Sequence, residues 1–265
     1  MVQLKAPVVL HKKVAPDHFL MRLKAPEIAR ESLPGQFIHV RCAEETFPLL
    51  RRPFSLLDAN PQTGTIDFIY KVVGLGTGTL AGISQGSRID VLGPLGHTFE
   101  IPSSLKRASL VGGGVGIPPL YLLAKRLLDR GVQVDAFLGA RTKGWLICTR
   151  EFRQLGIPVH VATDDGTLGF KGSVVTLLKG SIHQSKNPPT LYICGPTPMM
   201  AAAAKLAHQM KLPAQVSLEE RMGCAMGCCM GCVVEVATEP VTAHTRFQRV
   251  CTEGPIFPAE AIVWK

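Results

Sequence analysis

Residues 221–232 read Arg-Met-Gly-Cys-Ala-Met-Gly-Cys-Cys-Met-Gly-Cys, and a further cysteine, Cys251, follows downstream. Read through Cys224, Cys229, Cys232 and Cys251, the pattern is C-x4-C-x2-C with a distant fourth cysteine, which is the spacing of a plant-type [2Fe-2S] site. The glycines between the cysteines allow the backbone to wrap a cluster without Cβ clashes. The stretch therefore predicts a [2Fe-2S] cluster with these four cysteines as its ligands.

Two other interpretations of the cysteines compete with the cluster. Cys228 and Cys232 with Cys251 are compatible with a zinc site, although structural zinc usually takes paired C-x2-C hooks and only one is present. Disulfides require an oxidising compartment, to which the chain shows no route. Cys228 is the spare cysteine, and we expect its side chain to point away from the ligands.

Composition and charge limit the class of protein. The 265 residues are 46% hydrophobic and 18% charged, which fits a globular protein of more than one domain. Residues 1–13 carry charges where a signal peptide needs an apolar run, and no segment has membrane-spanning length, so we expect a cytoplasmic protein. The net charge of +9 is not accompanied by basic runs interleaved with aromatics, so phosphate-bearing cofactors or an acidic partner are favoured over nucleic acid.

Residues 1–102 have the pattern of a small β domain. Hydropathy alternates over 19–24, a Pro-Gly turn precedes 36–41, and 52–57 and 65–73 are rich in strand-forming residues. Closely spaced short strands with little room for helices predict an antiparallel β-barrel.

Residues 103–213 alternate between strand and helix patterns. Apolar runs at 108–111, 132–138, 157–162 and 191–194 are typical of buried parallel strands. Such alternation predicts a doubly wound α/β domain with a parallel sheet. Residues 214–265 form the cysteine-bearing tail, expected to be a small C-terminal cluster subdomain.

The helix patterns of this second domain are specific. Leu120, Leu123, Ala124 and Leu127 fall on one helical face, and Gly131 ends the helix. A second helix is predicted over 199–210.

The first motif with chemistry is Arg52-Pro53-Phe54-Ser55 on a barrel strand. An arginine fork suits a flavin pyrophosphate, but the tetrapeptide alone reads as a surface arginine before a core phenylalanine. The motif gains weight from Ile69-Tyr70-Lys71 on another strand and from the Gly/Thr turn over 74–80. Backbone N–H groups in such a turn bind phosphate, whereas the alternative is an ordinary glycine loop.

Two further motifs end predicted parallel strands. Residues 112–116 are Gly-Gly-Gly-Val-Gly at a strand-to-helix turn, a context for dinucleotide phosphate although the full G-x-G-x-x-G is absent. Cys194-Gly195-Pro196 ends a later strand. A lone cysteine there is more often a small buried residue, yet α/β folds place ligands at this edge.

Taken in order, these motifs resemble the ferredoxin reductase superfamily over nearly the whole chain. Within it, the C-terminal cysteines are similar to those of the electron-transfer subunits of NAD-dependent (type B) dihydroorotate dehydrogenases. The departures are the extra Cys228 and the eighteen residues between Cys232 and Cys251, which leave the intervening hairpin open.

The resemblance implies three cofactors: FAD, NAD and the [2Fe-2S] cluster. The residues implied to bind FAD are Arg52, Pro53, Phe54, Ser55, Ile69, Tyr70, Lys71, Gly76 and Thr77. Those implied to lie near the nicotinamide nucleotide are Gly112, Gly113, Gly114, Val115, Gly116, Ile117, Cys194, Gly195 and Pro196.

The resemblance also implies that dihydroorotate and an FMN belong to a separate catalytic subunit, with two copies of each subunit in a heterotetramer. Electrons then pass from that FMN through the cluster and FAD to NAD+, for pyrimidine biosynthesis. The sequence shows no nucleophile–base pair that we assign as catalytic. Two alternatives remain: a subunit of a ferredoxin-dependent or sulfide-related NAD(P)H oxidoreductase, and a zinc-bearing interaction protein.

The choice between NAD and NADP is ambiguous from the residues. Arg141 and Lys143 follow the second parallel strand and suit a 2′-phosphate, and no Asp or Glu stands at that strand end to read a ribose hydroxyl. The family resemblance decides for NAD.

Overall fold

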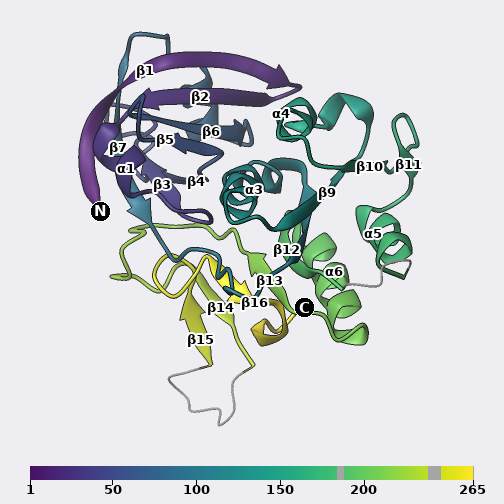
Figure 1. Cartoon of the computed structure of the whole chain (residues 1–265). Coiled ribbons are helices and arrows are strands. Elements are labelled where there is room, and N and C mark those ends of the chain that lie inside the picture. Colours follow the sequence, from purple (N-terminus) through teal and green to yellow (C-terminus); the bar gives the residue numbers. More distant parts are fainter. Residues whose placement is uncertain (184–187, 238–245, 265) are drawn as a thin grey trace.

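The computed structural model describes residues 1–183, 188–237 and 246–264. Two seven-stranded sheets make up most of this part of the chain, and a smaller tail carries the cysteines (Figure 1). No helix among the described residues is long and apolar enough to cross a membrane.

The first sheet is antiparallel throughout, in the order β4-β3-β7-β1-β2-β6-β5. Its strands are β1 (Val2–Ala15), β2 (His18–Lys24), β3 (Phe37–Val40), β4 (Arg52–Ser55), β5 (Asp58–Asn60), β6 (Thr65–Lys71) and β7 (Arg88–Leu95). Two short helices, α1 (Pro26–Glu31) and α2 (Leu75–Ala81), interrupt them. Of these elements, β1, β5, β7 and α1 were not identified from the sequence pattern.

The first sheet curls until strands that are not ladder neighbours meet. Phe54 of β4 stacks on Phe68 of β6 with ring centroids 5.1 Å apart. Met21 and Leu23 of β2 point into the enclosed core and are fully buried, as their alternation with polar residues predicts. The predicted antiparallel barrel is confirmed. It is partly open, because no hydrogen-bonded ladder joins the edge strands β4 and β5 among the described residues.

The second sheet has the order β11-β10-β9-β8-β12-β13-β16. Its strands are β8 (Arg107–Gly113), β9 (Gln133–Ala140), β10 (Val159–Thr163), β11 (Phe170–Lys171), β12 (Thr190–Cys194), β13 (Ala214–Ser217) and β16 (Ile256–Pro258). All pairings are parallel except that of β16 with β13. The predicted doubly wound α/β sheet is confirmed.

Helices cover both faces of the second sheet. The helices are α3 (Pro119–Asp129), α4 (Thr149–Gln154), α5 (Val174–His183) and α6 (Thr197–Gln209), with the 3-10 turns η1 (Gly114–Gly116) and η2 (Lys143–Trp145). One apolar cluster contains α3 and α4, and another contains α5 and α6. The four apolar residues predicted to share a face of α3 are all fully buried, whereas α4 and α5 had no predicted counterpart.

The order of the strands creates a switch point between β8 and β12. The chain winds outward from β8 through β9 and β10, then returns to place β12 on the other side of β8. Open α/β sheets bind ligands at the carboxyl ends of the strands flanking such a point. Gly112 and Cys194 are direct partners there.

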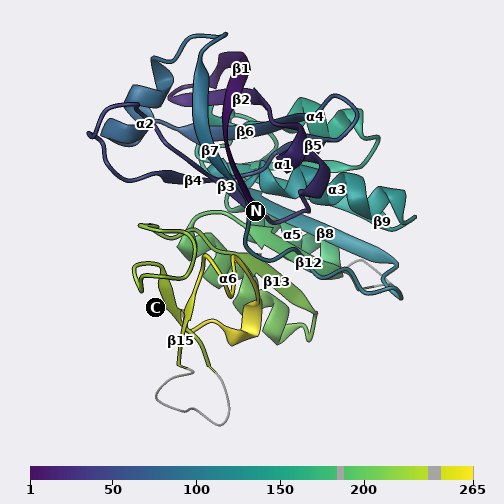
Figure 2. The ribbon, with the colours of Figure 1, turned by 90° about the vertical axis from the view of Figure 1, so that its left-hand side faces the viewer.

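The tail is joined to the second sheet rather than standing apart. The hairpin β14 (Val233–Glu235) and β15 (Phe247–Arg249) is followed by β16, in which Phe257 pairs with Val216 of β13, and by the 3-10 turn η3 (Ala259–Ala261). Figure 2 shows the tail below the first sheet, beside β13 and α6. The sequence analysis left the hairpin between Cys232 and Cys251 undetermined, and residues 238–245 lie outside the described residues.

Candidate functional site

A cleft of about 780 Å³ lies where the first sheet, the glycine turn after β8 and the segment before the cluster loop meet. Its lining residues are Phe37, Leu50, Arg52, Pro53, Phe54, Ser55, Ile69, Tyr70, Lys71, Val73, Thr77, Val115, Leu218, Glu219, Glu220, Arg221, Met222 and Pro255. All residues expected to contact flavin except Gly76 thus line one cleft. Its size is that of pockets for large cofactors.

Arg52 is placed in this cleft by a glycine beneath it. A Cβ on Gly76 would come 3.0 Å from Arg52 Nε, so a larger residue there would displace the guanidinium. Arg52 Nη1 donates to the carbonyl of Leu50 at 2.5 Å and to that of Arg51 at 3.2 Å. The Nε and Nη2 donors have no hydrogen-bond partner among the described residues and are free to bind an anion.

The aromatic and hydroxyl groups of the flavin motif have structural roles. Tyr70 is buried and stacks on Phe19, with ring centroids 5.8 Å apart. His11 Nδ1 lies 2.7 Å from the carbonyl of Ile83 and so donates to it, which leaves His11 Nε2 to accept from the Tyr70 hydroxyl at 2.9 Å. Burial raises the pKa of Tyr70. Tyr70 therefore lines the cleft with its hydroxyl already engaged by His11.

Two contacts fix the turn that follows β6. The Thr77 hydroxyl accepts hydrogen bonds from the N–H groups of Val73 at 2.9 Å and Gly74 at 3.2 Å. The Lys71 ammonium lies 4.3 Å from the centre of the Trp145 ring in η2, a cation–π contact between the two sheets. The Thr77 hydroxyl thus holds the turn in shape by binding two of its backbone N–H groups.

The two nucleotide motifs lie against each other at the switch point. A Cβ on Gly116 would approach the carbonyl carbon of Cys194 and the nitrogen of Gly195 to 2.4 Å, so only glycine fits. Gly195 has φ +158, and a Cβ there would lie 3.0 Å from Gly113 N. Cys194 is fully buried, and burial raises the pKa of its thiol, which makes it a small core residue.

The cysteines of the cluster loop fall into two pairs. Cys224 Sγ accepts N–H bonds from Met226 at 3.5 Å and Cys229 at 3.4 Å. The Met226 N–H, with further help from Cys229, lowers the pKa of Cys224 to about 6. Burial, followed by a hydrogen bond with Cys232, raises the pKa of Cys251 to about 11. The first two cysteines are therefore neighbours, and so are the last two.

This pairing suits a two-iron cluster. Within the described residues, no group of three or more His, Cys, Asp or Glu side chains surrounds a single metal-ion position. A [2Fe-2S] cluster instead takes two thiolates on each iron. Cys228 is exposed on the outside of the loop.

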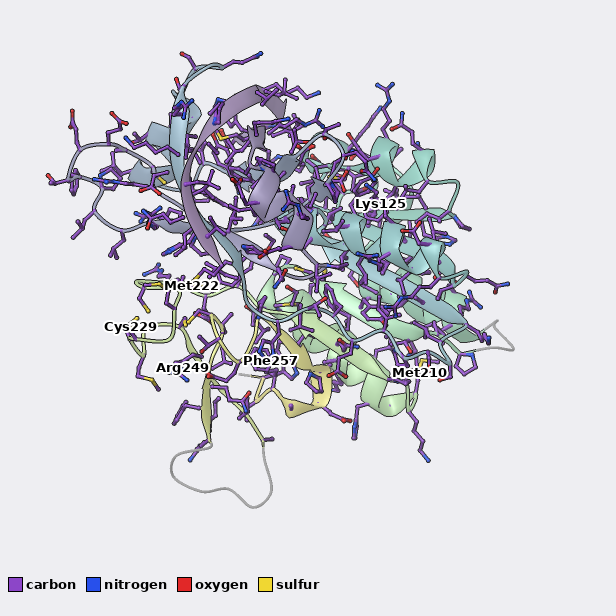
Figure 3. All side chains as sticks on the ribbon, turned by 60° about the vertical axis from the view of Figure 1, so that its left-hand side comes forward. Lys125, Met210, Met222, Cys229, Arg249 and Phe257 are labelled. Carbon is purple, nitrogen blue, oxygen red and sulfur yellow. The ribbon has the colours of Figure 1, made fainter. Side chains whose placement is uncertain are left out.

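Arg249 ties the cluster loop to the segment that carries Cys251. Its Nη1 donates to the carbonyl of Gly227 at 2.7 Å, and its Nε and Nη2 donate to Glu253 at 3.0 Å and 2.5 Å. In Figure 3, Met222 lies on the side of the loop nearest the first sheet, and Arg249 lies farther from that sheet. Met222 is 7% exposed, against 47% for Met226 and 61% for Met230, so the three methionines do not share one exposed face.

Several lining residues were not identified from sequence. Residues 218–222 form one wall of the cleft. The only feature of the sequence that could have indicated this is their position directly after the strand β13. The Glu219 side chain is exposed on that wall. Asp164 and Asp165 directly follow β10, and Asp165 N donates to the carbonyl of Arg141 at 3.3 Å. Two carboxylates therefore lie beside the end of β9, where the sequence analysis identified only the cations Arg141 and Lys143.

Three family models match successive parts of the chain. They are the oxidoreductase FAD-binding domain over residues 5–99, the oxidoreductase NAD-binding domain over 110–205, and the iron–sulfur cluster binding domain of dihydroorotate dehydrogenase B over 219–263.

Similar proteins cover nearly the whole chain. The electron transfer subunit of dihydroorotate dehydrogenase B (NAD(+)) from Desulforamulus reducens is 40% identical over 98% of both chains. Its counterpart from Geobacillus thermodenitrificans is 40% identical over 97% of this chain and 96% of that one. A chain of NADH-dependent reduced ferredoxin-NADP oxidoreductase is 34% identical, with a TM-score of 0.87 over 98% of this chain and 90% of that chain.

Proposed function

Because the chain belongs to the family of electron-transfer subunits of NAD-dependent dihydroorotate dehydrogenase B, we propose that its cleft is the point where electrons from a dihydroorotate-oxidising partner reach a nicotinamide nucleotide. The chain is an oxidoreductase subunit of pyrimidine biosynthesis with FAD-binding, NAD-binding and iron–sulfur domains. The observation that carries the proposal is the cleft itself, whose walls come from all three.

A flavin exchanges two electrons with nicotinamide and single electrons with an iron–sulfur cluster, so FAD supplies the conversion between them. Within the chain, Arg52 would bind the flavin pyrophosphate through its two free donors. Pro53, Phe54 and Ile69 would form the apolar wall, with Ser55, Tyr70, Lys71, Gly76 and Thr77 completing the set.

The glycine turn after β8 would hold the nicotinamide nucleotide. Its set is Gly112, Gly113, Gly114, Val115 and Gly116 together with Cys194, Gly195 and Pro196. The close approach of Gly116 to Cys194 supports this, because it packs the turn directly against the carboxyl end of β12 at the switch point. Val115 also lines the flavin cleft, which would bring the two nucleotides together.

The two cysteine pairs would each hold one iron, with Cys224 and Cys229 on the first and Cys232 and Cys251 on the second. The N–H donors around Cys224 support its thiolate form. We further propose domain boundaries near residues 102 and 213, which accord with the gaps between the three matched families.

The family name implies a catalytic partner subunit. We propose that this partner carries FMN and the dihydroorotate site, and that two copies of each subunit assemble. Cluster ligands must stay reduced, so a cytoplasmic location fits the eight cysteines of the chain.

Absorption spectroscopy and dye reduction test the cofactor assignment. The purified chain should show flavin and iron–sulfur bands and should reduce an artificial acceptor with NADH at a higher kcat/KM than with NADPH. Asp164 and Asp165 beside Arg141 disfavour a 2′-phosphate by repulsion. A preference for NADPH would contradict the nucleotide assignment, and a colourless chain that retains zinc would contradict the whole proposal.

A second candidate rests on the ferredoxin-linked relative. That chain is 34% identical and shares the fold over 98% of this one, so a subunit of a ferredoxin-dependent oxidoreductase would present the same motifs. Copurification with a dihydroorotate-oxidising subunit separates the two.

A further inference from the structure

A second cleft, of about 470 Å³, lies beside α4 and shares no lining residue with the flavin cleft. It is lined by Lys143, Leu146, Thr149, Arg150, Arg153, Gln154 and Leu168. We call it the basic cleft, because three of its residues are cationic and none is acidic. Figures 1 and 2 agree in placing α4 at the periphery, away from the cluster tail.

The three cations are not neutralised by the protein. The side chains of Lys143, Arg150 and Arg153 are exposed, and none forms an ion pair or hydrogen bond with another residue in the described parts of the chain. Three like charges around one small volume repel each other, so the folded chain gains nothing from gathering them. Their arrangement therefore indicates an external anion.

The nearby carboxylates are directed elsewhere. Glu151 follows Arg150 on α4, but its charge acts on Tyr121 and Cys148, on the side of α3, where it adds to burial in raising both pKa values. Asp165 accepts hydrogen bonds from the N–H and hydroxyl of Thr167 at 2.9 Å and 2.7 Å. Neither residue lines the basic cleft.

An independent observation comes from Thr149. Its hydroxyl oxygen is buried and has no hydrogen-bond partner among the described residues, although Thr149 lines the same cleft. A buried hydroxyl without a partner costs free energy and in native proteins is generally satisfied by water or a ligand. The wall of the basic cleft thus contains one unsatisfied hydroxyl beside the three cations.

The frame that carries these side chains is fixed. Phe152 of α4 is fully buried and packs edge-on against Tyr121 with ring centroids 5.6 Å apart. Lys143 N donates to the Thr167 hydroxyl at 2.9 Å, which joins the η2 turn to the loop after β10. Both walls of the cleft are therefore preorganised, which lowers the entropic cost of binding.

From this geometry we propose that the basic cleft binds the phosphate dianion of a small phosphorylated metabolite, separate from the redox nucleotide. Arginine forks and a hydroxyl donor match the several acceptor oxygens of a phosphate better than a carboxylate does. In the proposed function, the pyrophosphate of NAD lies at the glycine turn, and NAD has no other phosphate. The separation of this anion from the redox nucleotide therefore rests on the proposed function, whereas binding of an anion in the basic cleft does not.

Titration calorimetry of the cofactor-loaded chain with inorganic phosphate tests the site. We expect saturable binding that the double variant R150A/R153A weakens at least about tenfold, since both charge-assisted contacts are lost. Thr149→Val keeps the shape and should weaken binding by a factor of about three to ten. The matched control K12A/K13A removes the same charge from exposed positions on β1 and should bind phosphate as the wild type does.

NADH-dependent dye reduction at wild-type rates would show that each variant is folded. Absence of saturable phosphate binding by the wild type, or equal binding by R150A/R153A, overturns the proposal. A chain that binds phosphate but fails to reduce dyes would reject the proposed function alone.

Competition identifies the source of the phosphate. Phosphate binding that is unchanged by saturating NAD+ supports a separate metabolite. If adenosine 2′-monophosphate binds through Arg150 and Arg153 and NAD+ displaces it, the anion is the 2′-phosphate of NADP, and the separate-ligand proposal is wrong.

Discussion

At the scale of single residues, burial separates the cysteines that the sequence lists side by side. Cys232 and Cys251 are 1% and 2% exposed, Cys224 and Cys229 are intermediate, and Cys228 is exposed. A thiolate that holds iron must face its partner thiolates, whereas Cys228 faces solvent. Cys228 and Cys229 are adjacent in sequence, yet they differ in exposure. The backbone turns just before them at Gly227, whose φ is +79.

Serine substitution tests this assignment of ligands. We expect C224S, C229S, C232S and C251S to lose iron and acid-labile sulfide, because each removes a thiolate from the cluster. Cys228→Ser should retain both at wild-type levels. Iron and sulfide analysis of purified variants measures this. A cluster that survives Cys229→Ser but not Cys228→Ser contradicts the register.

Burial of His39 costs free energy of folding, and only the structure reveals that this histidine is buried. It is 1% exposed on β3, and neither ring nitrogen has a hydrogen-bond partner in the described chain. Burial, with a further contribution from the Arg51 charge, lowers the pKa of His39 from 6.5 to about 4. The unfolded chain therefore takes up a proton at higher pH than the folded chain does.

The sign of the pH dependence follows from that shift. Stability is unaffected by His39 above pH 6.5 and falls as pH decreases from 6.5 towards about 4, by roughly 2 kcal/mol at pH 5. His39→Leu should remove this part of the acid sensitivity. Urea unfolding at pH 7.5 and pH 5 compares it with the wild type and with the exposed control His208→Leu. Equal losses in wild type and H39L would be inconsistent with this explanation.

At the scale of elements, the cluster depends on a hairpin whose two strands are only three residues long. Such a short hairpin has little stability of its own. Arg249 compensates by binding Gly227 in the cluster loop and Glu253 beyond Cys251. This side chain therefore ties the loop that carries the first three ligands to the segment that carries the fourth.

Replacement of Arg249 measures that contribution. Arg249→Met keeps the aliphatic stem but loses the charge-assisted bonds, so iron should be released to a chelator about ten times faster. Arg246→Met is the matched control, because Arg246 pairs with Glu235 on the same hairpin but does not bind the cluster loop. Identical release rates for both variants would show that Arg249 does not hold the loop.

The elements also show what sequence reasoning captures. The β-region, the α/β alternation and the α3 face follow from local periodicity, and the structure confirms them. Helix α5 was missed because Val174, Val175 and Thr176 are strand-forming residues and Gly180 and Ser181 are poor helix formers. Residues 218–222 were missed because they join the cleft only through the placement of β13 beside β12, which is a long-range consequence of topology.

At the scale of the whole molecule, the described chain has one cleft shared by the flavin motif, the nucleotide turn and the approach to the cluster. Its lining takes residues from β4, β6, η1 and the segment before the cluster loop. The two sheets are joined there by the Lys71–Trp145 contact and, farther away, by Lys125 of α3 and Asp58 of β5 at 2.8 Å. The proposed cofactor sites are thus brought together by contacts between domains rather than by any one motif.

The described residues form a dinucleotide-type unit and a flavin-type barrel, and the cleft that they share is assigned to nucleotides. We therefore expect the chain alone to oxidise NADH with artificial acceptors. Dihydroorotate should become a reductant only when an FMN-bearing partner supplies its binding site. Met226 and Met230 are exposed on the cluster loop and offer adaptable contacts to such a partner.

The most direct test is the reduction of NAD+ by dihydroorotate, measured for the purified cofactor-loaded chain with and without the candidate partner. The account predicts no turnover by the chain alone and full turnover after the partner is added, with loss of that turnover in Cys251→Ser. Turnover of dihydroorotate by the chain without any partner would contradict it.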